Sequence, residues 1–354
     1  MIRVLVVDDS AVVRKILTEE LSKYPDIDVV GSAVDPYVAR DKIVELNPDV
    51  LTLDVEMPRM DGLSFLAKLM RHHPMPVVIV SSVTPKNSDA AIRALELGAV
   101  EVICKPGSAF TVPDVAKQLV RAIRAAASAR LPKQQDTPVA CRVTADPAFL
   151  AQMKATHKIL AIGASTGGTK AIETVLSSLP ATTPGTVIVQ HMPALFTASF
   201  ATRLNSISQM EVREARDNDS VVPGVALVAP GNHHMLLERD GARFIVKLKD
   251  GPAVHHQRPS VDVLFDSVAR KAGRNAVGVL LTGMGADGAK GLLAMRESGA
   301  YTLAEDESTC IVFGMPKEAI KLDAVDEVVP LGEMSNAIVG ALIGQGRQAV
   351  AQPA

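Results

Sequence analysis

Cysteine is scarce in this chain of 354 residues, which contains only Cys104, Cys141 and Cys310. An odd number at wide spacing argues against a disulfide framework and a CxxC metal clip, and it fits a reducing compartment. Apolar residues make up 47% of the chain, but their runs are shorter than a membrane span. The first residues, MIRVLVVDDS, also lack the pattern of a signal peptide. We therefore expect a cytoplasmic protein with no direct membrane insertion.

An excess of one charge is also missing. The chain has 37 Lys and Arg against 39 Asp and Glu, a formal net charge of -2 at pH 7. Nucleic acids and anionic membranes attract strongly basic surfaces, so this composition does not favour either partner. The length is about twice that of a typical single domain and predicts two domains.

Short Val/Ile/Leu-rich runs alternate with amphipathic stretches over residues 2–130. The runs are IRVLVV, DVVGSAV, VLTLD, PVVIVSS and EVICK. Continuous apolar strands imply burial on both faces, and alternation with helices implies a parallel sheet. The sequence therefore predicts an α/β fold whose first domain, residues 1–125, is a doubly wound five-stranded parallel sheet.

A second alternating region begins after residues with no clear apolar period. We interpret residues 126–154 as a linker and residues 155–346 as a second doubly wound α/β domain. Its apolar runs are KILAIGAS, TVIVQH, AVGVLLTG and YTLAE. Asp240-Gly241 is a strong turn signal and predicts a β-hairpin insertion. The charged run EVREARDND, residues 211–219, is expected to be a solvated stretch.

Three aspartates and a lysine follow buried runs of the first domain: Asp8 and Asp9, Asp54, and Lys105. The carboxyl ends of parallel strands share one edge of the sheet, so these side chains should converge. Two like charges ~4 Å apart repel by roughly 4 kcal/mol at an effective dielectric of ~20. Three ionised aspartates therefore need either a cation or raised pKa values. Mg²⁺, which prefers oxygen ligands, suits such a site. The alternative is that the aspartates are unrelated helix caps.

The motifs VLVVDDS, LDVEMPRMDG, PVVIVSS and CKP resemble the receiver domain of bacterial response regulators. This resemblance implies phosphotransfer from a histidine kinase to Asp54, with Ser81 and Lys105 contacting the phosphoryl group. It also implies Mg²⁺ held by four groups: Asp8, Asp9, Asp54 and the backbone carbonyl of Glu56. A phosphoryl group adds ~2 negative charges, which an ammonium and a hydroxyl can pair with.

The segment AIGASTGG, residues 161–168, leaves three interpretations of Ser165 open. A dinucleotide-binding GxGxxG motif lacks its middle glycine here, and the next strand ends in Gln190 and His191 instead of an acidic residue. A helix cap is possible, because a serine before a helix can accept a backbone N–H. A nucleophile is also possible, because GASTG fits GxSxG, the pattern of a strained strand-to-helix turn.

A nucleophilic serine needs partners, and two candidates end neighbouring apolar runs. His191 ends TVIVQH, and Asp287 follows VGVLL in the segment LLTGMGADG. A histidine can act as the base and a carboxylate can orient it. The run TGMG offers backbone N–H groups, with that of Met284 as the candidate oxyanion hole. Alternatively, His191 is a structural residue and Asp287 a turn residue.

The motifs IGASTGG, VQHMP, APGNHH and LTGMGADG resemble the chemotaxis protein-glutamate methylesterases over about residues 155–345. The resemblance implies that Ser165 is the nucleophile, His191 the general base and then acid, and Asp287 the orienting carboxylate. The implied reaction is hydrolysis of glutamate γ-methyl esters on the cytoplasmic domains of chemoreceptors, with deamidation of glutamines. It requires no cofactor in the esterase and implies activation by phosphorylation, with the unphosphorylated receiver covering the approach to Ser165.

Two other functions compete with the esterase. The second domain could be a binding module without catalysis, in which Ser165 only caps a helix. A DNA-binding output is disfavoured, because residues 155–345 show buried strands and the chain is not basic. The pairs His233-His234 and His255-His256 do not predict a metal site, because adjacent strand residues point to opposite faces.

Overall fold

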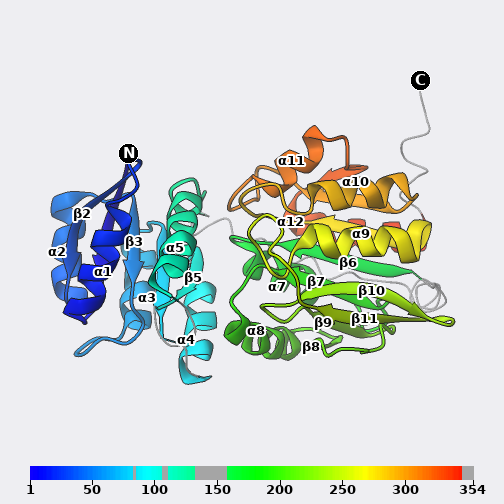
Figure 1. Ribbon diagram of the computed structural model, residues 1–354, viewed down its shortest axis with the longest axis horizontal. Helices are drawn as coiled ribbons and strands as arrows, with labels where there is room; N and C mark the ends of the chain where they lie inside the picture. Colours follow the sequence, from blue (N-terminus) through cyan, green and yellow to red (C-terminus); the bar gives the residue numbers. More distant parts are fainter. Residues whose placement is uncertain (83–84, 106–110, 132–157, 345–354) are drawn as a thin grey trace. The chain divides into compact units, whose positions relative to one another are not determined.

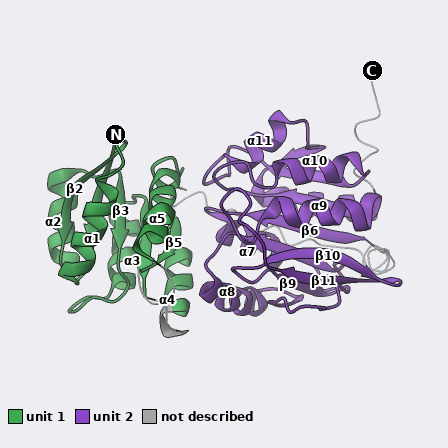
Figure 2. Ribbon diagram, viewed as in Figure 1, with its two compact units in different colours: residues 1–136 green, residues 137–354 purple. Residues whose placement is uncertain are grey.

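The computed structural model describes residues 1–82, 85–105, 111–131 and 158–344 (Figure 1). The chain divides into two compact units, residues 1–136 and 137–354 (Figure 2). Most of the expected linker, residues 132–154, lies outside the described residues, and the predicted domain boundaries stay predictions. None of the helices described is both long enough and apolar enough to cross a membrane.

The first unit is a five-stranded sheet in the order β2-β1-β3-β4-β5, with every neighbouring pair parallel. Its strands alternate with helices, as the sequence predicts, and all except the edge strand Ile27–Ala33 are mostly buried. The strands are β1 (Ile2–Val7), β2 (Ile27–Ala33), β3 (Val50–Leu53), β4 (Val77–Ser81) and β5 (Glu101–Cys104). The helices are α1 (Ala11–Leu21), α2 (Pro36–Leu46), α3 (Gly62–His72), α4 (Pro85–Glu96) and α5 (Val112–Ala127).

The second unit contains a seven-stranded parallel sheet in the order β14-β13-β12-β6-β7-β9-β8. The strands are β6 (Ile159–Ala164), β7 (Thr186–Gln190), β8 (Glu211–Glu214), β9 (Val225–Val228), β12 (Ala276–Leu280), β13 (Tyr301–Glu305) and β14 (Glu327–Val329). The helices are α7 (Gly168–Ser178), α8 (Ala194–Ile207), α9 (Val261–Ala272), α10 (Ala289–Glu297), α11 (Met315–Lys321) and α12 (Leu331–Ile343), with a short 3-10 turn at Gly273–Asn275.

The predicted hairpin insertion is present as β10 (His234–Asp240) and β11 (Arg243–Lys249), paired antiparallel around Asp240 and Gly241. Figure 1 shows β10 beside α9. The core joins apolar side chains of the sheet, α9, α10 and the hairpin, among them Val189, Phe265 and Leu237. The hairpin therefore covers part of the core that the helices leave open.

The expectation of a solvated stretch over residues 211–219 is wrong for its first part. Glu211–Glu214 forms β8, the edge strand that pairs with β9. Val212 is buried, whereas Glu211 is exposed and Glu214 half-buried. An edge strand with one wet face tolerates charged side chains, which explains why composition alone misled.

The strand order reverses at β6, which lies between β7 and β12. In open parallel sheets, crevices form at such a point, beyond the carboxyl ends of the strands. Ser165 directly follows β6, so the fold places this residue at the switch point of the second unit.

Candidate functional site

The acidic group of the first unit converges as the strand pattern predicts. Asp8 and Asp54 follow β1 and β3, whose last residues, Val7 and Leu53, are partners in the sheet. Nζ of Lys105 lies 2.7 Å from Oδ2 of Asp54 and 2.7 Å from Oδ2 of Asp8. Lys105 thus compensates part of the negative charge of two buried carboxylates.

Burial dominates the electrostatics of Asp54. It raises the pKa of this carboxyl to about 6, although the hydrogen bond from Lys105 acts in the opposite direction. Burial lowers the pKa of Lys105, but hydrogen bonds to Asp54 and Asp8 outweigh that effect and leave the pKa above its ordinary value. One ammonium therefore does not fully compensate this site.

The site fits Mg²⁺. Carboxylate oxygens of Asp8, Asp9 and Asp54 lie within 4.8 Å of one another. Oδ2 of Asp8 is buried, and its only partner among the described residues is the ammonium of Lys105. The backbone carbonyl of Glu56 accepts no hydrogen bond from the described residues. These oxygens are the ligand type that a hard divalent cation prefers.

Ser81 is at the end of β4 but its hydroxyl does not contact Asp54. The side chain is fully buried, and Oγ donates to the backbone carbonyl of Ser82 at 3.3 Å. The predicted contact between this hydroxyl and a phosphoryl group on Asp54 stays a prediction.

Ser165 occupies a tight turn between β6 and α7. Its backbone N–H donates to the carbonyl of Thr282 (3.0 Å), and its carbonyl accepts from Gly168 (2.7 Å). The N-cap of α7 is Gly167, at φ 78° and with no side-chain capping bond. The helix-cap interpretation of Ser165 is therefore wrong for this helix, and no hydrogen bond from the described residues reaches its hydroxyl.

His191 lies beside Ser165 because β6 and β7 are neighbours in register. Ala164 and Gln190 are partners in the sheet, so Ser165 and His191 are the next residue of each strand. Nε2 of His191 lies 2.7 Å from Oδ2 of Asp287. Nδ1 is buried and has no hydrogen-bond partner in the part of the chain that the structure describes.

Asp287 is the best-satisfied carboxylate of this region. Besides His191, it accepts from the hydroxyl of Ser260 (2.7 Å) and from the backbone N–H groups of Val261 (2.8 Å) and Asp262 (3.0 Å). Burial acts to raise the pKa of Asp287, but these hydrogen bonds, above all that with His191, hold it below the ordinary value. The lowered pKa keeps the carboxylate ionised at neutral pH, and an ionised carboxylate can only accept, so Nε2 of His191 is the donor in this hydrogen bond.

The loop that contains Met284 packs directly against Ser165. A Cβ atom at Gly283 would lie 2.7 Å from Cβ of Ser165, so only glycine permits this approach. The backbone N–H of Met284 donates to no acceptor among the described residues, and its side chain is 40% exposed. This loop therefore presents a free donor near the serine.

The structure places the second histidine pair outside the strands. His255 and His256 lie in a turn, both at positive φ, instead of on a strand. His255 Nε2 is 3.0 Å from Asp262 and lies in a cluster with Asp262 and Asp287. The oxygens of Asp287 are already occupied by the four donors above, so the cluster gives no reason to infer a metal.

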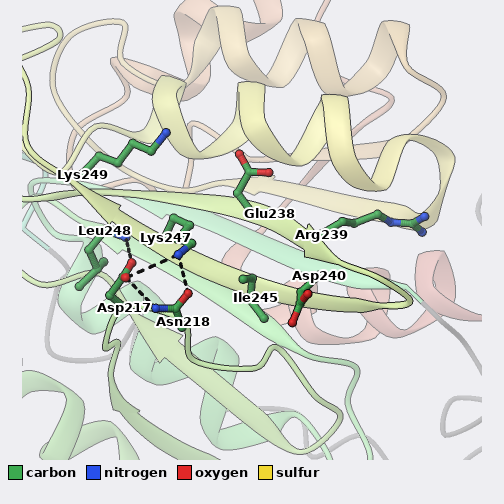
Figure 3. A pocket seen from close by; sticks show the side chains of 9 residues that line it. All are labelled: Asp217, Asn218, Glu238, Arg239, Asp240, Ile245, Lys247, Leu248 and Lys249. Atoms are coloured by element: carbon green, nitrogen blue, oxygen red, sulfur yellow. Dashed lines mark hydrogen bonds and ion pairs between the residues drawn. The ribbon is translucent and has the colours of Figure 1, made fainter.

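A surface pocket of about 670 Å³ lies beside β10 and β11 (Figure 3). Its lining carries charges of both signs, including Asp217, Glu238 and Lys249. None of the predicted site residues lines it, so it is separate from the group around Ser165.

Comparison with known proteins identifies both halves of the chain. Residues 4–114 match the response regulator receiver domain and residues 160–338 match the CheB methylesterase family. A protein-glutamate methylesterase/protein-glutamine glutaminase of Syntrophus aciditrophicus is 60% identical over 338 residues, 96% of this chain and 98% of the relative. The chain belongs to the CheB methylesterase family.

Other members support this assignment. A protein of the same name from Escherichia coli (strain UTI89) is 54% identical over 336 residues, 94% of this chain and 95% of the relative. The crystal structure of the Thermotoga maritima CheB methylesterase catalytic domain is 38% identical, with a TM-score of 0.51, and covers 51% of this chain and 97% of its own length. The α/β fold that the sequence predicts for the second domain is thus the fold of this CheB catalytic domain.

Three buried polar residues of this CheB family member escaped the sequence interpretation. They are Gln190, Ser260 and Glu305, each within one hydrogen bond of a predicted site residue or of Thr282. Gln190 and Glu305 end the mostly buried strands TVIVQ and YTLAE, each directly after an apolar residue. An amide or carboxyl group at the end of such a run was the available signal. Ser260 precedes α9 and carries no comparable signal.

Proposed function

We propose that the second unit hydrolyses glutamate γ-methyl esters with Ser165 as nucleophile, His191 as base and Asp287 as orienting carboxylate. The observation that carries this proposal is the state of the His191 ring. Nε2 is paired with an ionised carboxylate, and Nδ1 is buried and has no partner within the described ranges. The strand register places His191 beside Ser165, whose hydroxyl receives no hydrogen bond from those residues either. This arrangement is that of a serine hydrolase triad.

The reaction follows from these positions. Oγ of Ser165 attacks the ester carbonyl carbon while its proton moves to Nδ1 of His191. The imidazolium, stabilised by Asp287, then protonates the leaving methoxide, and methanol departs. Water, deprotonated by the same nitrogen, attacks the glutamyl ester of Ser165 and releases glutamate and the free serine. The N–H of Met284 would donate to the oxyanion in both halves.

The same intermediate accommodates glutamine. An amide passes through a similar tetrahedral state, with ammonia leaving in place of methanol. We therefore extend the proposal to deamidation of glutamines on the same substrates, the cytoplasmic domains of chemoreceptors, in chemotactic adaptation. The names of the relatives, which pair a methylesterase with a glutaminase, support this extension.

We further propose that a histidine kinase phosphorylates Asp54 and that this modification raises the esterase rate. Mg²⁺ held by Asp8, Asp9, Asp54 and the Glu56 carbonyl would neutralise charge during phosphoryl transfer. The added phosphoryl oxygens would compete with Asp54 and Asp8 for the ammonium of Lys105. The hydroxyl of Ser81, which now donates to Ser82, would supply a second donor after rotation.

Methanol release from methylated receptor by the purified protein tests the proposal. We expect Ser165→Ala to lower the rate by at least ~10³-fold, and a small phosphodonor with Mg²⁺ to raise it in the wild type but not in Asp54→Asn. Near-normal release by Ser165→Ala would exclude the triad. If Asp54→Asn no longer incorporated phosphate but its esterase rate still rose with the phosphodonor, Asp54 would be excluded as the switch.

A further inference from the structure

Gln190 is a polar residue in an environment that disfavours it. It is the last residue of β7, whose five residues are all buried, and its side chain is 3% exposed. Burial of an amide is unfavourable unless its polar atoms form hydrogen bonds. The amide of Gln190 therefore needs hydrogen-bond partners inside the protein.

The amide nitrogen of Gln190 joins the two residues of the proposed catalytic pair. Nε2 donates to the backbone carbonyl of Ser165 (2.9 Å) and to that of His191 (3.0 Å). The two carbonyls belong to the residues that directly follow β6 and β7. Both N–H groups of one side chain thus connect the serine turn with the histidine turn.

The orientation of this amide is fixed by its neighbours. A carbonyl can only accept, so the NH₂ end must face Ser165 and His191, and Oε1 must point away. Oε1 is buried and has no donor among the described residues. An unpartnered buried acceptor is unfavourable, so the amide is held in this orientation by the two bonds of its nitrogen.

The backbone of α7 is adapted to this amide. A Cβ atom at position 168 would lie 2.3 Å from Oε1 of Gln190, so the second glycine of STGG leaves the space that the amide occupies. The N–H of Ser165 is held from the other side by the carbonyl of Thr282. The backbone of Ser165 is therefore hydrogen-bonded on both sides, to Gln190 at the end of β7 and to Thr282 just after β12.

We propose that Gln190 is a positioning residue that fixes the backbone of Ser165 relative to His191 and so keeps the hydroxyl within reach of Nδ1. This inference rests on the proposed esterase function. It predicts that removal of the amide lowers the rate of chemistry, because a misplacement of about 1 Å can cost ~10²-fold. Substrate binding, which uses other surfaces, should change little.

The test compares Gln190→Met, which keeps the volume without donors, with Gln190→Glu, whose protonated form retains one donor. Gln209→Met, at an exposed position, is the matched control. We expect kcat for methanol release to fall by about 10- to 100-fold in both variants, with KM within about twofold. The ratio of Gln190→Glu to wild-type kcat should rise as the pH is lowered, whereas that of Gln190→Met should not.

Labelling of Ser165 by a fluorophosphonate probe separates this inference from the proposed function. Absence of labelling in the wild type would contradict the esterase proposal. Normal labelling in the wild type with an equal rate in Gln190→Met would overturn the positioning role. If Gln190→Met fails to fold, as judged by its thermal transition, a pH-independent ratio for Gln190→Glu would overturn it instead.

Discussion

Asp54 and Asp287 are both buried aspartates beyond the carboxyl ends of parallel strands, yet their pKa values move in opposite directions. The pKa of Asp54 is raised to about 6 and that of Asp287 is lowered. Asp54 receives one hydrogen bond from Lys105 and a longer one, 3.2 Å, from the N–H of Glu56. Asp287 receives three bonds from Ser260 and the start of α9, in addition to that with His191.

This difference indicates that the number of hydrogen-bond donors, together with burial, sets the direction in which the pKa of each of these two aspartates moves. The carboxylate proposed to orient His191 lies at the N-terminus of α9 and accepts from backbone N–H groups that the helix itself leaves without partners. The carboxylate proposed to take up a phosphoryl group has fewer donors, so a bound cation would change its environment strongly.

The largest effect is expected at Asp287. Asp287→Asn removes the charge that stabilises the imidazolium and presents an NH₂ group to donors, so we expect kcat to fall by about 10²- to 10⁴-fold. Methanol release at neutral pH measures the fall, and Asp240→Asn at the exposed hairpin turn is the control. A loss below about fivefold would mean that orientation by Asp287 contributes little.

Glu305 is a third buried carboxyl and sharpens the comparison. It accepts from the N–H of Thr282 (2.9 Å) and the hydroxyl of Thr309 (3.2 Å), and no ion pair reaches it within the described ranges. Burial raises its pKa to about 7, and the charge of Asp306 acts in the same direction. With few donors and no cation, Glu305 should behave like Asp54 and unlike Asp287.

This difference has a sign that stability measurements can check. The pKa of Glu305 is higher in the folded state than its ordinary value of 4.5, so the folded state binds more protons. Its contribution to the free energy of unfolding is therefore present below pH ~4.5 and is lost as the pH rises to ~7, by roughly 3 kcal/mol at most. Glu305→Gln should remove this loss. Calorimetry measures the transition temperatures of the wild type and of Glu305→Gln between pH 5 and 8. The same pH dependence of the transition temperature in both proteins would contradict the prediction.

The smallest effect concerns one donor of Asp287. Ser260→Ala removes the hydroxyl that donates to Oδ1 and also accepts from the N–H of Val263 at the start of α9. Removal of a donor disfavours the ionised carboxylate, so the loss of activity on the acid side should begin at higher pH, and kcat at neutral pH should fall several-fold. An unchanged pH profile of kcat would show that the remaining donors suffice.

The sequence predicted best the candidate site residues that follow buried parallel strands. The positions of Ser165, His191 and Asp287 follow from apolar runs, since parallel strands bring their carboxyl ends to one edge. The contribution of Ser260 does not follow, because this residue reaches Asp287 through a loop with no periodic pattern. The charged edge strand β8 was missed for a related reason: strand pairing with β9, a tertiary interaction, overrides a composition that favours solvent.

The position of β6 between β7 and β12 has a consequence for the synthesis of the chain. The N–H of Ser165 binds the carbonyl of Thr282, and Asp287 lies further on. A nascent chain that has emerged only as far as β11 thus contains the serine and the histidine but neither the strand that holds the first nor the carboxylate that orients the second. Under the proposed mechanism, esterase chemistry can begin only after Asp287 has been synthesised, whereas the N-terminal sheet has all five of its strands by Cys104.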